Sequence, residues 1–469
     1  MNKLAMPNFK RWFVDFFLVI IIGFKLKIIK NLIMKFSLSD SRIRVFRNII
    51  WAVIGKTVNI LSGLFVGVLV ARYLGPEQYG LMSYVISYVT LFSIIASFGF
   101  DNIEIRELAK NNQPKEQILG TALCLRLFLA ICTVALIAFS VFLFEADEFT
   151  LWMIVIYSFS LILNSFSIIR NYFTSMVNNE YVVKTEIART TIGAGIKIGL
   201  LLLKAPLEWF IIAVTFDFFI VATGYIYSYR EKVGSFKQWT FNRDIAVYQI
   251  KESFPLLLSG AAIIVYQTVD QIMIRNMIGN AAVGQYVVAA KLAEFIVFIP
   301  MIISQTIAPI LVKARMDDLN IYEAKRRQFF DIIIWSTVFF SLILSLCAAP
   351  LINLLYGDKY FEAIPVLQIV AWKAIFAAMF ASSGQIIIIE HKHKLAALRN
   401  LIGCFFNILL NLLLIPIMGL TGAAFVSIFT LLITGYLSHA VISPYKFIFH
   451  IQTNSIVFGL PRLLRRIFK

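Results

Sequence analysis

Long apolar runs alternate along the chain with short polar segments, and this pattern predicts an all-α integral membrane protein. An apolar run of about 20 residues is long enough to cross a bilayer as one helix. No polar connection exceeds about 25 residues, which leaves no room for a soluble catalytic or nucleotide-binding domain. We expect about 12 transmembrane helices, near residues 49–71, 81–100, 118–144, 151–169, 187–203, 209–227, 253–274, 285–312, 329–355, 363–389, 400–415 and 422–443.

Basic residues follow the parity of the connections between these runs. Of the 43 Lys and Arg, six lie inside the expected spans, Arg189 among them at the start of the fifth, and most of the others lie in connections of one parity. The connections of the opposite parity hold only four: Arg72, Lys204, Arg275 and Lys359. Because cytoplasmic loops carry the excess of Lys and Arg, we expect both termini and the 229–252 connection in the cytoplasm. The turns at 145–148 and 357–362 are then expected outside.

Composition supports the membrane assignment and excludes other classes. The chain is 60% apolar and 15% charged, whereas a soluble domain is about half apolar and a quarter charged. Its net charge of +17 lies mostly in connections, which suits anionic lipid headgroups, and we expect no nucleic-acid partner. The cysteines fall in apolar runs without metal-ligand spacing, so we expect no metal, cofactor or disulfide: Cys124, Cys132, Cys347 and Cys404.

The ends of the chain differ from its middle. Residues 1–45 are expected to form a basic interfacial segment, because the apolar run at 12–24 is too short to span a membrane. Met34 offers an alternative start, just before a short polar lead into the first span. The remaining chain divides into an N-lobe of helices 1–6 (46–228), a cytoplasmic linker (229–252), a C-lobe of helices 7–12 (253–443) and a basic cytoplasmic tail (444–469).

A glycine pattern recurs between the two expected lobes. Gly75 and Gly80 flank the turn after the first span, and Gly279 and Gly284 flank the turn after the seventh, at one offset of 204 residues. Glycine suits tight turns that need positive φ, although short turns also favour it by chance. An even number of spans separates the two copies, so both have the same orientation. Two parallel six-helix bundles of this kind are typical of transporters with a central substrate path.

Charged side chains inside the apolar runs are the candidate functional residues, because a charge in hydrocarbon usually faces a partner or a wet cavity. Cations outnumber acids among them, which suits an anionic substrate with a phosphate or pyrophosphate group. The candidate substrate-binding cations are Lys56, Arg126, Lys197, Lys291 and Lys373. The candidate acids for ion or proton coupling, or for ion pairs, are Asp217, Asp270 and Glu294.

Neutral polar residues inside the apolar runs are further candidates, and for several of the candidate residues a structural role is an alternative to a functional one. The candidate polar lining residues are Asn59, Gln267, Asn407 and Asn411. The asparagines equally suit hydrogen bonding between helices. Lys291 and Glu294 lie at i and i+3, so an internal ion pair is an alternative to a substrate site. Lys56 could instead extend its ammonium group to the headgroups.

Several segments in order resemble a known family over roughly residues 45–445. They are ARYLGPEQYG at 71–80, GFDNIEIRELAK at 99–110, DQIMI at 270–274, GQY at 284–286, LYGDKY at 355–360 and NLLLIPIMG at 411–419. With these segments the chain resembles the Wzx-type polysaccharide (O-antigen) flippases, relatives of the lipid II flippases and the MATE drug exporters.

The resemblance implies a V-shaped, two-lobe, MATE-like transporter in the bacterial inner membrane, and not an enzyme. Its expected substrate is an undecaprenyl-pyrophosphate-linked oligosaccharide, moved from the cytoplasmic to the periplasmic leaflet with coupling to an ion or proton gradient. Membrane lipids, a polysaccharide polymerase and a chain-length regulator are its candidate partners. The residues also leave two alternatives open. A drug exporter of the same fold would have a more acidic, aromatic cavity, and a glycan polymerase or glycosyltransferase would have a long outward loop or a carboxylate pair.

Overall fold

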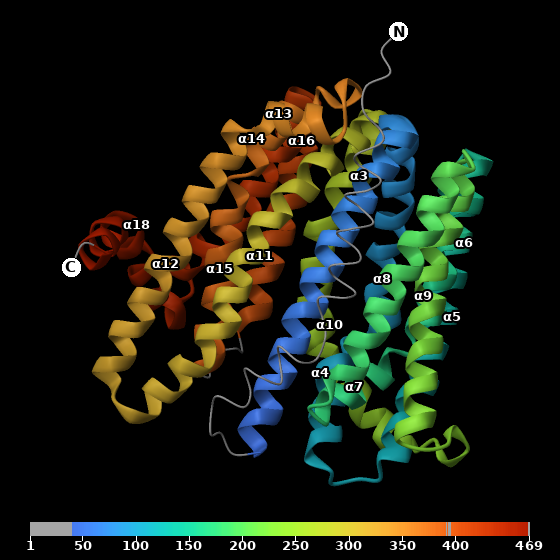
Figure 1. Cartoon of the computed structure of the whole chain (residues 1–469), viewed down its shortest axis with the longest axis horizontal. Helices are drawn as coiled ribbons and strands as arrows, with labels where there is room; N and C mark the ends of the chain where they lie inside the picture. Colours follow the sequence, from blue (N-terminus) through green and yellow to red (C-terminus); the bar gives the residue numbers. More distant parts are fainter. Residues whose placement is uncertain (1–39, 391, 393–394, 468–469) are drawn as a thin grey trace.

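A computed structural model describes residues 40–390, 392 and 395–467, and its long elements in this part of the chain are all α-helices (Figure 1). The N-lobe holds α3 (Asp40–Ser97), α4 (Phe100–Lys110), α5 (Lys115–Phe144), α6 (Glu148–Asn164), α7 (Ser167–Ser175), α8 (Asn179–Leu202) and α9 (Leu207–Lys232). After the short helix η1 (Phe236–Gln238), the C-lobe holds α10 (Arg243–Met277), α11 (Asn280–Asp317), α12 (Leu319–Leu346), α13 (Ala348–Leu355), η2 (Asp358–Tyr360), α14 (Ala363–Val370), α15 (Lys373–Ile389), α16 (Ala396–Leu432), η4 (Ile433–Leu437), α17 (Ser438–Val441), η5 (Ser443–Tyr445) and α18 (Lys446–Ile467).

The expected number of spans is confirmed. Nine helical segments of the described chain are long and apolar enough to cross a membrane. Two of them, in α3 and α16, each hold two spans around a glycine outside helical geometry: Gly75 with φ 72° and Gly419 with φ 60°. A twelfth segment, α8, is less apolar because it carries Arg189 and Lys197.

The two lobes converge at one end of the molecule and diverge at the other, so the bundle has a V shape (Figure 1). We call these the closed end and the open end. A single hydrophobic core joins the lobes toward the closed end, through residues of α3, α6, α10, α11, α14 and α16. Two separate cores lie toward the open end: one is confined to the C-lobe, and the other belongs to the N-lobe and the start of α10. In the described residues the lobes are therefore joined by a core at the closed end, and at the open end the N-lobe core reaches only the start of α10.

The repeated glycines form the seal at the closed end. A Cβ on Gly80 would overlap the backbone carbonyl of Asn280, and one on Gly284 would overlap that of Pro76. The turns therefore pack backbone against backbone across the lobe interface, which only glycine permits. Arg275 of the C-lobe also contacts Glu145 of the N-lobe at 2.8 Å. The pattern that suggested an internal repeat thus lies where the two copies meet.

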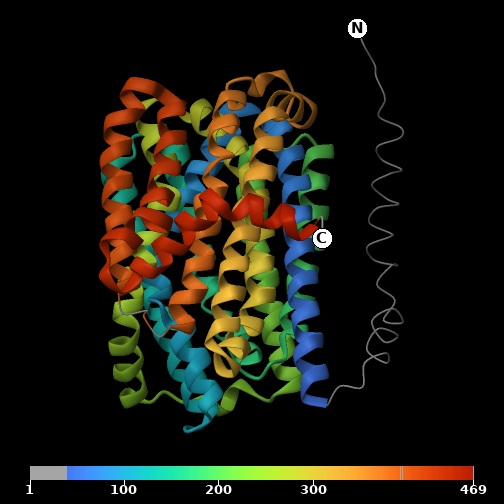
Figure 2. The same cartoon turned by 90° about the vertical axis from the view of Figure 1, so that its left-hand side faces the viewer.

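Several expected boundaries need correction. The spans at 151–169, 329–355 and 363–389 each break into two helices, near Ser165, Cys347 and Ala371. The motif at 99–110, expected as a connection, forms helix α4 after two residues with positive φ, Phe98 and Gly99. The segment expected as a basic tail forms α18, which crosses the C-lobe transversely (Figure 2). The expectations for residues 1–39 and for the Lys56 side chain lie outside the described residues.

Candidate functional site

Arg126 lies in a buried ion-pair network of the N-lobe, not in a cavity. Its side chain is 3% exposed, and its guanidinium donates to both carboxylate oxygens of Glu104 at 2.8 and 2.7 Å. Asp101 accepts from it at 2.7 Å, and Ser167 at 2.9 Å. Asn171 donates to both acids, so the network joins α4, α5 and α7. This corrects the expectation that Arg126 offers a free charge to substrate, because its two acids lie on another helix of the same lobe.

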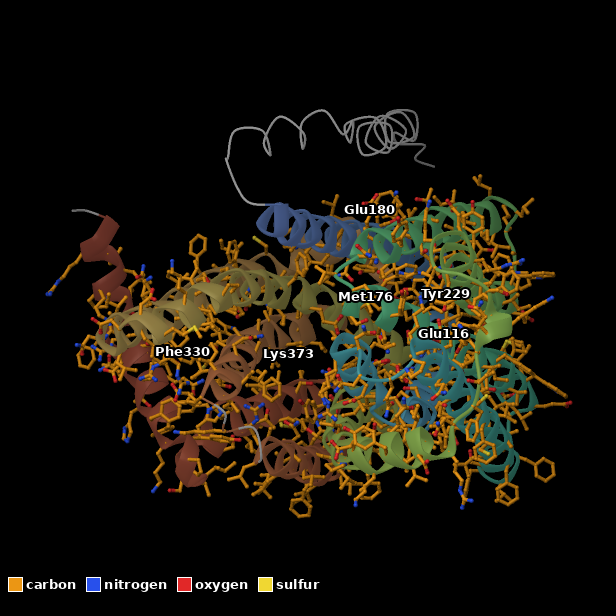
Figure 3. All side chains as sticks on the ribbon, turned by 90° about the horizontal axis from the view of Figure 1, so that it is seen from below. Glu116, Met176, Glu180, Tyr229, Phe330 and Lys373 are labelled. Atoms are coloured by element: carbon orange, nitrogen blue, oxygen red, sulfur yellow. The ribbon has the colours of Figure 1, made fainter. Side chains whose placement is uncertain are left out.

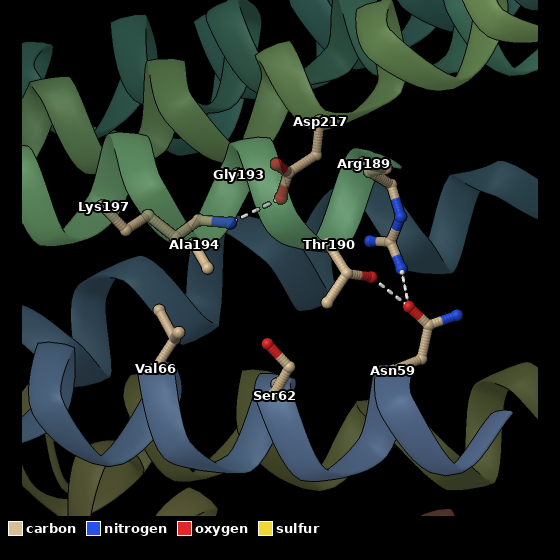
Figure 4. A pocket seen from close by; sticks show the side chains of 10 residues that line it. Asn59, Ser62, Val66, Arg189, Thr190, Gly193, Ala194, Lys197 and Asp217 are labelled. Atoms are coloured by element: carbon tan, nitrogen blue, oxygen red, sulfur yellow. Dashed lines mark hydrogen bonds and ion pairs between the residues drawn. The ribbon is translucent and has the colours of Figure 1, made fainter. Parts of the chain in front are cut away.

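A small polar pocket lies between α3, α8 and α9 (Figure 4). Its volume is about 80 Å³, enough for a few water molecules. Asn59 lies at one side, where its amide donates to Glu186 at 2.6 Å and its carbonyl accepts from Arg189 at 3.1 Å and from Thr190. The Ser62 hydroxyl is buried there without a partner among the described residues. Asn59 therefore works as a bridge between α3 and α8.

Lys197 and Asp217 close the other side of this pocket as an ion pair. Their charged atoms lie 2.5 Å apart, and the second oxygen of Asp217 is buried without a partner in the described part of the chain. That carboxylate packs directly on Gly193, where any side chain would collide with it. The N-lobe thus neutralises a second of the expected cations.

Asp270 is the centre of a buried polar cluster in the C-lobe. It is 3% exposed and accepts hydrogen bonds from Tyr286 at 2.9 Å and Ser427 at 3.0 Å. Asn411 and Asn407 donate to its other oxygen at 2.6 and 3.2 Å. All four donors are neutral, and no cation pairs with Asp270 in the described residues. Three of the expected residues therefore meet in one site, at which a carboxylate lacks a compensating charge.

The remaining expected residues do not join these clusters. Lys291 is exposed and donates to the Tyr79 hydroxyl of the N-lobe at 3.0 Å, not to Glu294, which is also exposed. Lys373 is half-buried, has no ion-pair partner in the described residues, and lies between the lobes on the inner side of the C-lobe (Figure 3). Gln267 is exposed and makes no hydrogen bond to the Asp270 cluster in the described residues. Lys291 and Lys373 of the C-lobe therefore make no ion pair in the described residues.

Sequence reasoning missed several charged residues that the structure places in or beside the candidate sites. Asp101 and Glu104 are spaced at i and i+3, a signal that they share a helical face, but their segment was read as a connection. Glu186 and Arg189 fell at the edge of a span whose start was placed too late. Arg399 was likewise assigned to a loop, although it is 4% exposed in the first turn of α16. Each error came from a boundary and not from the residue type.

Solved transporter structures share this fold. The chain superposes on the lipid II flippase MurJ in an inward closed conformation with TM-score 0.67 and 15% identity, over 89% of this chain and 93% of that one. It superposes on an inward-facing multidrug resistance MATE family transporter with TM-score 0.62 and 12% identity, over 87% and 95%. It also matches the MATE multidrug transporter DinF-BH, with TM-score 0.63 and 17% identity over 87% and 96%. At these identities the likeness establishes the fold alone.

Sequence comparison assigns the family. An uncharacterized membrane protein of Methanocaldococcus jannaschii is 29% identical over 89 residues, which span 19% of this chain and only 18% of that protein. The family model described as polysaccharide biosynthesis protein matches residues 45–315, more than half of the chain, including the closed-end turns, the Arg126 network and Asp270. The chain belongs to the polysaccharide biosynthesis protein family, and it has several membrane-spanning helices in the fold shared by MurJ and the MATE exporters.

Proposed function

We propose that this protein is a flippase that moves an undecaprenyl-pyrophosphate-linked oligosaccharide from the cytoplasmic to the periplasmic leaflet of the bacterial inner membrane. The family places the chain in polysaccharide biosynthesis, and the V-shaped fold suits alternating access by two rocking lobes. The observation that carries the proposal is that Lys291 and Lys373 on the C-lobe make no ion pair in the described residues. A pyrophosphate group supplies the opposite charge that these ammonium groups lack.

The open end faces the cytoplasm in this proposal. The α11–α12 hairpin and the α9–α10 connection both lie at the open end (Figure 1). They carry basic clusters that include Lys313, Lys325 and Arg327 in the first, and Arg230 and Lys237 in the second. Cytoplasmic connections hold such clusters, whereas the closed-end turns hold few basic residues. The lobes would then admit substrate from the inner leaflet and release it after the glycine seal opens.

The roles of the interior residues are revised from the geometry. Lys291 and Lys373 bind the pyrophosphate, whereas Arg126 and Lys197 hold the N-lobe together through Glu104 and Asp217. Asp270 is the coupling residue, because it is a buried carboxylate that no cation of the described residues neutralises, and a bound monovalent cation would supply the missing charge. The charge at Asp270 would then depend on the ion gradient. The preferred arrangement of α10 and α16, which the Asp270 cluster joins, would depend on that charge.

A MATE-type exporter of small molecules is the second candidate function, favoured by the fold shared with DinF-BH. The resemblance to such exporters implies tolerance of cationic substrates. The exposed ammonium group of Lys291 and the unpaired one of Lys373 would repel a cationic substrate, and the family model points to polysaccharide biosynthesis instead.

A reconstituted transport assay separates the two functions. Proteoliposomes would carry a fluorescent undecaprenyl-pyrophosphate disaccharide, and an impermeant quencher would report the leaflet that it occupies. Wild-type protein is expected to exchange the probe between leaflets, and Lys373→Met and Lys291→Met to slow it, while Lys359→Met at the exposed closed end is the charge-matched control. Exchange no faster than in empty liposomes, together with uptake of a cationic fluorescent dye, would favour the exporter.

A further inference from the structure

Arg399 is a buried arginine without an acidic partner. It lies in the first turn of α16 at the open end of the C-lobe, and it is 4% exposed. Within the described residues no carboxylate bonds to it, whereas Arg126 in the N-lobe contacts two. A buried charge without an opposite charge is costly, and inside a membrane protein such a group usually faces a functional partner.

A chain of hydrogen bonds fixes the position of this guanidinium. The amide nitrogen of Gln452 donates to the backbone carbonyls of Met379 at 3.3 Å and Gly435 at 3.1 Å. Because carbonyls only accept, the amide oxygen of Gln452 must point to His439 Nδ1, 3.0 Å away, and Nδ1 carries the proton. The other ring nitrogen, Nε2, is then a free acceptor for Arg399 Nη1 at 3.3 Å. The arginine is therefore held by a neutral histidine.

The guanidinium of Arg399 makes hydrogen bonds through one nitrogen and leaves another without a partner in the described residues. Ser383 also accepts from Nη1, at 3.2 Å, so the fixed bonds converge on that nitrogen. Nε is buried and has no hydrogen-bond partner in the described part of the chain. An arginine held in this way is preorganised, because its remaining N–H groups keep the planar geometry that matches phosphate or carboxylate oxygens.

Phe380 and Lys373 connect this arginine with the space between the lobes. The Phe380 ring covers the guanidinium, with Arg399 Cζ 4.1 Å from the ring centre, and the ring itself is only half-buried. Lys373 lies two helical turns earlier on the same face of α15, about 10 Å along the axis. An anion that passed between Arg399 and Lys373 would therefore follow one face of one helix from the open end toward mid-membrane.

We infer that Arg399 is an anion-binding subsite that receives the phosphate or pyrophosphate group of the lipid-linked substrate at the open end, once the Phe380 ring turns aside. The anion then passes to Lys373 and Lys291. This inference rests on the proposed function and adds an entry subsite to it. Neither composition nor spacing could indicate the subsite, because it depends on which side chains of α15, α17 and α18 meet around Arg399 in the described structure.

Anion binding to the purified full-length protein tests the subsite. Inorganic pyrophosphate and glycan-free undecaprenyl pyrophosphate would be titrated against wild type, Arg399→Met, Arg399→Lys and the charge-matched control Lys359→Met. Arg399→Met is expected to bind undecaprenyl pyrophosphate roughly tenfold or more weakly, as the loss of a charge-assisted hydrogen bond predicts. Arg399→Lys should recover part of the affinity. A parallel loss for inorganic pyrophosphate would show that the free anion also binds there, and a loss for the lipid alone would identify the lipid as the occupant.

A second measurement separates binding from a structural role. Replacing an unpaired buried cation by an apolar side chain removes its desolvation cost, so the melting temperature of Arg399→Met should be unchanged or higher. His439→Phe, which keeps the charge but removes the acceptor, should weaken binding without abolishing it. If Arg399→Met binds undecaprenyl pyrophosphate with wild-type affinity, Arg399 is not an anion-binding subsite. If Arg399→Met does not fold, wild-type affinity in Arg399→Lys refutes the subsite instead. The proposed function would survive this result if Lys373→Met still lost binding and transport, and would fail if wild type bound neither probe.

Discussion

Removing Arg126 is expected to destabilise the N-lobe severely. Arg126→Met would leave the Glu104 carboxylate, which is fully buried, with only the Asn171 amide as a donor. Asp101 would keep Arg170 and is nearly half exposed, so it adds little to the cost. Stranding one partner of a buried ion pair costs about 3–5 kcal/mol. For a unit the size of one lobe this corresponds to a melting temperature about 6–20 °C lower.

The double variant identifies the cause. Arg126→Met combined with Glu104→Gln removes both charges, and it should recover much of the loss because no charge is then left buried and unpaired. Arg106→Met is the matched control, because Arg106 lies on α4 close to Glu104 but its ion pairs with Glu107 and Glu252 are at the surface. Such surface pairs contribute roughly 0–1 kcal/mol.

The assay is thermal unfolding of purified protein in detergent, together with the amount of protein in the membrane fraction. The reasoning is refuted if Arg126→Met melts within about 2 °C of wild type, well inside the loss expected for a stranded buried charge. It is also refuted if the double variant is no more stable than Arg126→Met alone. Transport by Arg126→Met should fall in proportion to the folded protein, because Arg126 does not contact substrate in this account.

Three further outcomes are expected. Asp270→Asn should remove the dependence of transport on the ion gradient while the protein still folds, and gradient-driven transport at the wild-type rate would contradict a coupling role. Gly284→Val should push the closed-end turns apart at a cost of about 1–3 kcal/mol. Spin labels across that end should then report longer distances than in wild type, and unchanged distances would mean that the seal does not depend on this contact. Arg462→Met removes the contacts of α18 with Asp331, at 2.6 and 2.9 Å, and proteolysis should then cleave α18 faster, whereas unchanged cleavage would show that its packing on α12 suffices.

The sequence predicted the architecture because the period and length of apolar runs are local properties. Twelve spans, two lobes and the repeated glycine turns all follow from the order of residues and from the cost of unpaired backbone groups in lipid. The repeated glycines were informative because each copy of the turn needs a positive φ or a close backbone approach that other residues do not allow. Their contact across the lobes could not be predicted, since it depends on how the two bundles pack.

The site was predicted only in part, because charge neutralisation is a property of three-dimensional neighbours. Asp270, Asn407 and Asn411 were expected on inward faces, and the structure joins them, although they come from segments far apart in the sequence. Arg126 resembled a free cation in the sequence because its acids lie in a segment without the length of a span. Arg399 resembled a loop charge because its burial comes from α15 and α17.

The unequal neutralisation of the two lobes has an electrical consequence. Moving one elementary charge through a membrane potential changes the free energy by about 2.3 kcal/mol per 100 mV. The interior cations Arg126 and Lys197 travel with their own counter-ions, so rocking the N-lobe displaces little net charge. The C-lobe carries Lys291 and Lys373 without acids bonded to them in the described residues. The C-lobe also holds Arg399, Asp270 and Glu294, so three interior cations stand against two acids and its net charge without substrate is positive. A bound pyrophosphate makes that net charge negative, and the membrane potential then drives the loaded C-lobe in the opposite direction.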